Sequence, residues 1–154
     1  MQIVNPASGA VLDEVPETTA EQVAAAYAAA RAAQPEWAAR PLDERISALQ
    51  RFAASVEAQR DQLAPILTAE TGKPISQAAG EITATLARIA FFVEHVASAV
   101  ADEVVRQSDG LTEVIRREPL GVVANISAWN YPWFVGTNVF VPALLCGNSV
   151  LYKP

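Results

Sequence analysis

Two polar residues in the last part of the chain, Asn130 and Lys153, have side chains well suited to chemistry. An asparagine amide beside the start of a helix is a neutral donor that could hold a developing oxyanion. Lys153 is the only charged residue after Glu118, and it could reach a ribose hydroxyl or a phosphate. Each also has an ordinary alternative: Asn130 as a turn or helix N-cap, and Lys153 as a solubilising charge at a strand end.

Both residues follow segments with the pattern of one βαβ unit. The pattern predicts a buried strand, a helix and another buried strand at residues 120–126, 132–145 and 148–152. Parallel strands joined by a right-handed crossover end at the same edge of a sheet, which is where open α/β sheets bind ligands. We therefore expect the segment from Ser127 to Asn130 to converge with Lys153 at that edge.

The preceding residues predict helices and two antiparallel hairpins. The hairpins are expected at residues 2–4 with 10–15 and at residues 104–108 with 111–117. Asp109-Gly110 favours a type I′ turn in the second one. The helices are expected from the Thr18/Thr19 capping boxes to about residue 33, from Pro41 through 56, from about 61 to 70, and from Pro74 to about 101. Gly72 suits the left-handed position that ends a helix, and Pro142 should kink or end the helix that contains it.

Other candidate sites are weaker. Cys146 lies at an apolar helix terminus, where a free cysteine usually packs as a small hydrophobe, so we do not expect a nucleophile and base pair with His95. Glu70–Pro74 contains Gly-Lys but lacks the remaining residues of a phosphate loop, and it is interpreted as a helix terminator. No Cys, His or carboxylate cluster suggests a metal site, and no Gly-x-Gly-x-x-Gly is present.

The composition limits the possible classes of protein. The chain has 154 residues, 51% of them hydrophobic, and 11 Lys and Arg against 17 Asp and Glu. This composition is typical of a globular chain, and its acidic balance disfavours nucleic-acid binding. Residues 119–152 carry no charge, but Asn, Pro and Gly residues interrupt them, so no membrane span is expected. A single cysteine and the absence of a signal-peptide pattern predict a cytoplasmic protein.

Several motifs together resemble the NAD(P)-dependent aldehyde dehydrogenase superfamily. They are Asn5–Gly9, Glu70–Pro74, Arg117–Val123, Trp129–Pro132, Pro142–Leu144 and Gly147–Pro154. Their order and spacing are similar to those of the family across essentially the whole chain. The resemblance implies that an aldehyde is oxidised to a carboxylic acid with NAD or NADP as cofactor.

The resemblance also assigns roles to residues. Asn130 matches the family's oxyanion donor, and Lys153 matches the lysine that contacts the adenosine ribose. Ile126, Ser127, Ala128 and Trp129 match the segment that lines the dinucleotide site. The chain departs from many members at Asn138-Val139, where they have Trp-Lys, and at Ala128, where they have Pro; these departures leave the aldehyde unspecified.

The resemblance implies an N-terminal portion of an aldehyde dehydrogenase. Its expected parts are residues 1–101 with a hairpin and helices, residues 102–118 with oligomerisation strands, and residues 119–154 with the first βαβ unit. The expected fold class is α/β, with that unit belonging to an incomplete doubly wound, Rossmann-like parallel sheet. Because the nucleophilic Cys and catalytic Glu of the family are not matched, the isolated chain is expected to be inactive, and the full-length form to be a homo-oligomer.

Two alternatives remain open. The chain could be a non-catalytic remnant or interaction module that pairs its exposed strands with itself or a partner, most readily through the hairpin from Val104 to Arg117. It could also belong to a relative that reduces an acyl phosphate or a CoA thioester, which would need different downstream residues.

Overall fold

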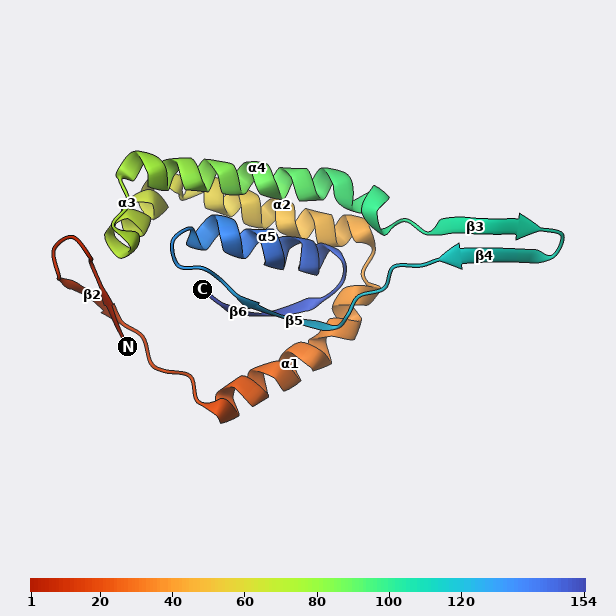
Figure 1. The fold of residues 1–154 in the computed structure, drawn as a ribbon, viewed down its shortest axis with the longest axis horizontal. Coiled ribbons are helices and arrows are strands. Elements are labelled where there is room, and N and C mark those ends of the chain that lie inside the picture. Colours follow the sequence, from red (N-terminus) through yellow and green to blue (C-terminus); the bar gives the residue numbers. More distant parts are fainter.

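The computed structural model describes all 154 residues and has a mixed α/β fold, as predicted. Figure 1 shows most of the helices gathered above a pair of parallel strands, with the first helix of the chain below them and a long hairpin projecting to one side. The elements in chain order are β1 (Gln2–Val4), β2 (Val11–Glu14), α1 (Ala20–Ala39), α2 (Leu42–Ala58), α3 (Arg60–Thr71), α4 (Ile75–Val100), β3 (Glu103–Ser108), β4 (Leu111–Ile115), β5 (Val122–Ile126), α5 (Pro132–Leu145) and β6 (Ser149–Lys153).

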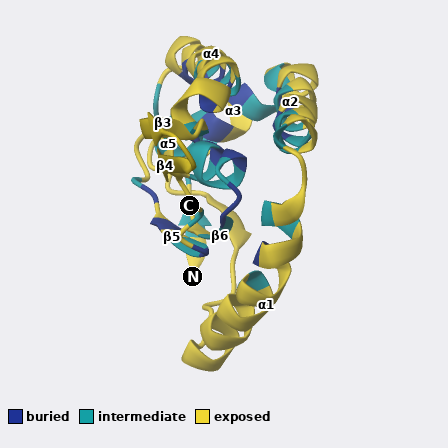
Figure 2. Cartoon of the chain, turned by 90° about the vertical axis from the view of Figure 1, so that its right-hand side faces the viewer, coloured by how far each residue is buried: buried dark blue, intermediate teal, exposed yellow.

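The apolar core lies where α2, α3, α4 and α5 meet, and the buried residues in Figure 2 concentrate there. One cluster joins α2, α4 and α5 through Leu49, Ile89, Val96, Val141 and Leu145. A second cluster joins α2, α3 and α4 through Val56, Ala64, Leu67, Ala78 and Ile82. Residues of α4 therefore belong to both clusters, although Ile75 at the start of this helix is exposed.

Most of the predicted helix boundaries are confirmed. The Thr19–Gln22 capping box begins α1, and Gly72 takes the left-handed conformation that ends α3. Pro41 and Pro74 are the N-cap residues of α2 and α4 rather than members of the first turn. The expectation that Pro142 could end a helix segment is wrong, since α5 runs through it.

Helix α1 is longer than predicted and continues through Pro35 to Ala39. Tertiary contacts explain the extension, because its second half is bonded to the end of α5. The Gln34 amide donates to the Gly147 carbonyl at 2.9 Å, and the Trp37 indole donates to the Leu144 carbonyl at 2.8 Å. By contrast, Val23 in the first half of α1 is exposed.

The predicted βαβ unit is confirmed. Strands β5 and β6 are parallel, and their register places Ile126 opposite Lys153. The pair lies between α5 and α1 (Figure 1), both of which contact it. The sequence predicted that both strands are buried, but the structure leaves them only partly buried. A two-stranded sheet covered by two helices has exposed edges and strand ends.

Both predicted hairpins are present. β1 and β2 pair near the N-terminus, while β3 and β4 form the projecting arm and have every residue exposed. The turn of the arm is not type I′, because that type needs positive φ at both central residues. Gly110 has a φ of 80°, but no residue other than glycine has a positive φ.

Helix α4 is the one helix long and apolar enough to cross a membrane, judged by length and composition alone. Buried core helices pass the same test, and residues of α4 belong to both apolar clusters.

Candidate active site

The ends of β5 and β6 bring two of the predicted site residues together. The Ser127 backbone N–H donates to the Lys153 carbonyl at 2.9 Å, so the chain leaves both strands at one edge. The Ser127 hydroxyl is buried and has no hydrogen-bond partner in the chain. The Lys153 ammonium contacts only the neighbouring Pro154 carbonyl, at 3.0 Å. The residues that carry this hydroxyl and this ammonium are therefore neighbours at the carboxyl edge of the strand pair.

The apolar residues around Ser127 form an open surface. Ile126 is 78% exposed and Trp129 is 83% exposed, while Ala128 is half-buried. Contiguous exposed apolar surface can mark a ligand-binding groove or a protein interface. Ile126 and Trp129 therefore leave apolar surface exposed at the end of β5, on either side of the buried Ser127.

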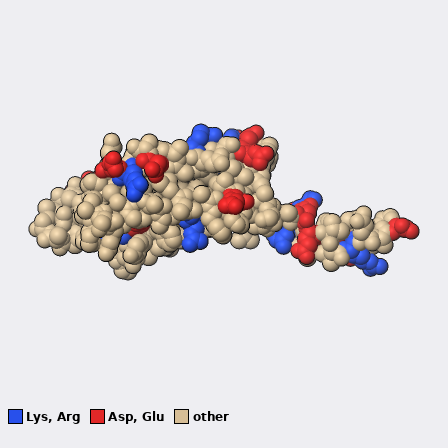
Figure 3. All heavy atoms as spheres, turned by 90° about the horizontal axis from the view of Figure 1, so that it is seen from above, with Lys and Arg blue, Asp and Glu red and all other residues tan.

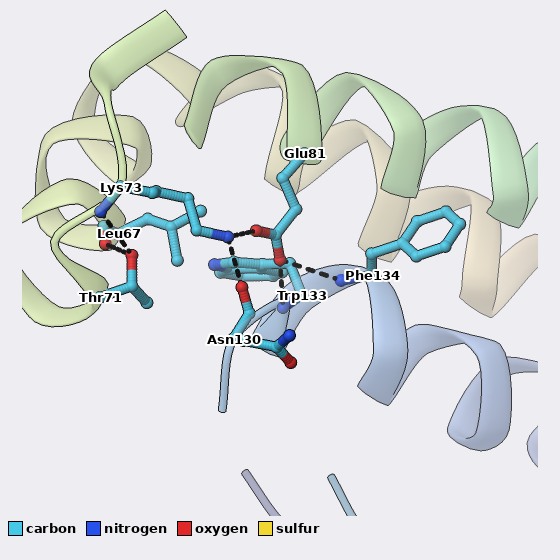
Figure 4. A network of polar contacts seen from close by, with 7 residues as sticks. All are labelled: Leu67, Thr71, Lys73, Glu81, Asn130, Trp133 and Phe134. Atoms are coloured by element: carbon cyan, nitrogen blue, oxygen red, sulfur yellow. Dashed lines mark hydrogen bonds and ion pairs between the residues drawn. The ribbon is translucent and has the colours of Figure 1, made fainter. Parts of the chain in front are cut away.

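Asn130 lies three residues beyond Ser127, in the loop that leads into α5. Figure 4 shows that its backbone carbonyl points toward the Lys73 ammonium, whereas its side-chain amide points away from that group. The amide has no hydrogen-bond partner in the chain and is therefore available as a donor. This is the state that an oxyanion donor requires before a substrate binds.

The same loop lines a hollow of about 560 Å³. Trp129, Asn130 and Tyr131 form one wall, and the turn from Glu70 to Pro74 forms another, with Pro6 at its margin. Lys153 does not line this hollow. The structure therefore places Asn130 and Lys153 on the same side of the strand pair, but in separate surroundings.

Two hydrogen bonds, of which only the first is buried, hold α5 against the strands below it. The Asn125 amide donates to the Gly136 carbonyl at 3.0 Å, and the Tyr152 hydroxyl donates to the Pro132 carbonyl at 3.2 Å. Both donors come from strands and both acceptors from α5, so the first turns of the helix have a fixed place relative to the strand ends. The Asn130 loop is tied to the sheet through them.

The sequence prediction missed two residues that contact this loop, Lys73 and Glu81. Their side chains form an ion pair and are only 10% and 0% exposed, respectively. Glu81 falls on the buried face of α4, between Ala78 and Thr85 at helical spacing. A carboxylate on an apolar helix face needs a partner, and that pattern was the signal that could have revealed the pair.

Cys146 and His95, which are not expected to form a catalytic pair, have different surroundings. His95 is exposed on α4, where its ring stacks on Phe91 and its Nδ1 lies 2.8 Å from the Phe91 carbonyl. Cys146 follows α5, and burial raises the pKa of its thiol while Arg45 acts in the opposite direction. Across the chain, no group of three or more His, Cys, Asp or Glu residues is arranged to hold a metal ion.

Comparison with known proteins gives a consistent result. The sequence profile described as the aldehyde dehydrogenase family matches residues 1–154. An N-succinylglutamate 5-semialdehyde dehydrogenase of Pseudomonas fluorescens is 42% identical over 153 residues, covering 99% of this chain and 31% of the relative. The enzyme of the same name from Escherichia coli K12 is 38% identical, over 97% of this chain and 30% of that relative.

Solved structures agree with the sequence matches. The NADP-dependent glyceraldehyde-3-phosphate dehydrogenase of Bacillus halodurans C-125, complexed with NADP, has a TM-score of 0.92 and 32% identity, covering 100% of this chain and 33% of that one. A putative methylmalonate-semialdehyde dehydrogenase of Sinorhizobium meliloti 1021, complexed with NAD, has a TM-score of 0.91 and 31% identity, over 97% of this chain and 30% of that one. The chain thus spans about a third of the length of the proteins it matches.

Proposed function

Because the chain belongs to the aldehyde dehydrogenase family, we propose that it supplies the oxyanion donor and part of the cofactor cleft for NAD(P)-dependent oxidation of an aldehyde to a carboxylic acid. The observation that carries the proposal is the free Asn130 amide, which lies beyond the carboxyl end of β5 on the same side as Ser127 and Lys153. Open α/β sheets bind ligands at this edge.

The residues at the strand ends fit a dinucleotide. The buried Ser127 hydroxyl lacks a partner, and the Lys153 ammonium contacts only an adjacent carbonyl. Lys153 would contact a ribose hydroxyl, and Ile126, Ala128 and Trp129 would lie against the rings. When bound, NAD or NADP would accept the hydride that leaves the aldehyde carbon.

Asn130 would act on the carbonyl oxygen of the aldehyde. As that oxygen gains negative charge, the Asn130 amide would donate a hydrogen bond that is stronger in the transition state than in the ground state. The chain's own cysteine does not suit the role of nucleophile, since burial raises the pKa of the Cys146 thiol. We therefore propose that residues 1–154 alone do not turn over an aldehyde.

The three parts of the chain would have different tasks. Residues 1–101 would support the site with a hairpin and helices, and residues 102–118 would form the oligomerisation arm. Residues 119–154 would begin the cofactor-binding unit. Because several relatives are named for N-succinylglutamate 5-semialdehyde, this is the first aldehyde to test, with either NAD or NADP.

The experiment is a kinetic comparison in a catalytically active protein that contains this chain. We expect Asn130→Ala to lower kcat by roughly 10²- to 10³-fold, the range for losing one oxyanion donor. Asn130→Asp should be at least as damaging, because a carboxylate would repel the oxyanion. The dissociation constant of NAD(P), measured by fluorescence, should stay unchanged in both variants.

A matched control is Gln50→Ala, which removes an exposed amide from α2, far from the strand ends. It should leave kcat unchanged. If Asn130→Ala turned over as fast as the parent protein, Asn130 would have no part in the mechanism.

A second candidate function is an interaction module, and the projecting arm favours it. All residues of β3 and β4 are exposed, including apolar side chains at Val104, Val105, Leu111, Val114 and Ile115. Such an arm is suited to pairing with a second copy of the chain, and this pairing is compatible with a catalytic role.

A further inference from the structure

We propose that the buried Lys73–Glu81 ion pair is a positioning device that fixes the backbone of Asn130 and so aims its amide at the reacting oxygen. The inference rests on the proposed function, since it gives Lys73 and Glu81 a role only through Asn130. Neither residue was among the predicted site residues. Figure 4 shows the pair between the turn after α3 and the loop before α5.

Lys73 directly contacts the Asn130 loop. Its ammonium donates to the Asn130 carbonyl at 2.6 Å and lies 4.0 Å from the centre of the Tyr131 ring. It also donates to one oxygen of Glu81. An ammonium has three N–H donors, and these three neighbours accommodate them all. The carbonyl of the proposed donor residue is therefore held by a charged group that is itself fixed by Glu81 and Tyr131.

Glu81 holds the other side of the loop, at the first turn of α5. Its second oxygen accepts from the backbone N–H groups of Trp133 at 2.9 Å and Phe134 at 3.3 Å. The N-cap residue Tyr131 gives no side-chain hydrogen bond to this helix, and Pro132 has no N–H. Glu81 thus satisfies helix-terminal amides that would otherwise lack partners.

The placement of Glu81 has a chemical consequence. Free N–H groups at a helix N-terminus attract anions, including a developing oxyanion. The Trp133 and Phe134 amides are already occupied by the carboxylate, so they do not compete with the Asn130 side chain for the reacting oxygen. The carboxylate in turn is neutralised by Lys73, which keeps net negative charge away from that oxygen.

The position of Lys73 is fixed by the turn that carries it. Gly72 has a φ of 74°, which only glycine adopts readily, and its N–H donates to the Thr68 carbonyl at 2.9 Å. Pro74 then starts α4 as its N-cap. Lys73 is therefore anchored by the end of one helix and the start of the next, so it can act as a rigid support rather than as a flexible surface charge.

Two substitutions separate the parts of the device. Lys73→Met removes the ammonium from the Asn130 carbonyl, while Glu81→Gln keeps an acceptor for Trp133 and Phe134 but removes the negative charge. In an active protein that contains this chain, we expect each to lower kcat by roughly tenfold to a hundredfold, the scale for a small misplacement of a catalytic group. Lys73→Arg, which keeps the charge, should recover part of the loss.

A double substitution tests whether Lys73 acts through Asn130. If it does, Lys73→Met should lower kcat in the parent protein but have little further effect in the Asn130→Ala background. The dissociation constant of NAD(P) should change less than threefold throughout. A merely structural role would instead lower kcat by the same factor in both backgrounds, and that result would overturn the inference.

The control is the exposed ion pair in α1, where Arg40 and Glu36 are 48% and 82% exposed. Arg40→Met and Glu36→Gln should leave kcat unchanged. Where Lys73→Met lowers the yield of folded protein, Glu81→Gln and Lys73→Arg answer the same question. If Asn130→Ala lowers kcat but both Lys73→Met and Glu81→Gln leave it unchanged, the inference fails while the proposed function stands; if Asn130→Ala has no effect, the proposed function fails first.

Discussion

At the scale of single residues, the chemistry of Cys146 follows from its surroundings. The thiol lies at the end of α5, where burial raises its pKa and Arg45 only partly opposes that effect. A thiolate is the reactive form of cysteine, so a raised pKa lowers the reactive fraction at any pH below it. This environment favours a structural role for Cys146 over the role of a nucleophile.

We expect Cys146 in the folded protein to react with iodoacetamide more slowly than a cysteine in an unfolded chain. The rate should rise as the pH increases through and beyond the ordinary range for a thiol, about 8.5. Mass spectrometry of the alkylated protein measures the rate, and the same protein in guanidinium chloride is the reference. In a catalytically active protein that contains this chain, Cys146→Ala should leave kcat unchanged. Loss of turnover in that variant would contradict the exclusion of this thiol from catalysis.

The residues of the site differ in how far the sequence could predict them. Asn130 and Lys153 follow predicted strands, so the rule that parallel strands end at one edge was enough to bring them to the same side. Lys73 could not be found that way, because its partner Asn130 is 57 residues away and the contact depends on how the turn after α3 meets the loop before α5. Only Glu81 could have been recognised from the sequence, because it is a carboxylate on an otherwise apolar face of a predicted helix.

At the scale of elements, close approach of β6 to α5 depends on a glycine. A Cβ added at Gly136 would lie 2.8 Å from Cζ and 3.2 Å from Cε2 of Tyr152, and closer still to the hydroxyl. The Tyr152 hydroxyl donates to the Pro132 carbonyl, and its ring lies 5.5 Å from that of Phe140, so moving the side chain aside would disturb both contacts. The missing side chain at Gly136 therefore lets the strand lie against the helix.

Gly136→Ala should lower the free energy of unfolding by about 1–3 kcal/mol, as overpacking does, even though Ala is the better helix former. The matched control is Gly80→Ala in α4, where an added Cβ meets nothing within 4 Å. That change should raise the free energy of unfolding by roughly 0.5–1 kcal/mol. Urea denaturation of both variants measures the difference.

Removing the obstruction should reverse the effect at Gly136. In a Tyr152→Ala background, Gly136→Ala should become neutral or stabilising. Equal gains from Gly136→Ala and Gly80→Ala in the parent protein would contradict this account of the contact between β6 and α5.

Some helix boundaries could be predicted from the sequence, and others could not. Gly72 and Gly147 mark helix ends because the left-handed conformation suits glycine, and both have positive φ. The end of α1 could not be predicted, since the proline signal at Pro35 is overridden by bonds from Gln34 and Trp37 to the end of α5. Those bonds join residues more than 100 positions apart, and local patterns carry no information about them.

At the scale of the whole molecule, the arm formed by β3 and β4 stands apart from the helices. Figure 3 shows opposite charges gathered where the arm leaves the body, and two ion pairs lie there. Arg116 contacts Asp102 at 2.8 Å, and Arg117 contacts Glu103 at 3.4 Å. The hydrogen bond from Arg116 is the main cause of a lowered pKa at Asp102, so this pair persists until the pH falls below the ordinary range of a carboxyl.

The arm has unpaired strand edges and exposed apolar side chains, which favour pairing with another copy of the chain. Val104 and Val114 lie opposite each other across the two strands, so glutamate at both places like charges side by side. We expect light scattering to show that the parent protein forms a defined oligomer and that Val104→Glu with Val114→Glu weakens its assembly tenfold or more. Because all arm residues are exposed, the melting temperature of the monomer should change little. The control is Ala54→Glu, which adds the same charge on the exposed face of α2 and should leave assembly unchanged. A parent protein that is monomeric at every concentration would contradict the role of the arm.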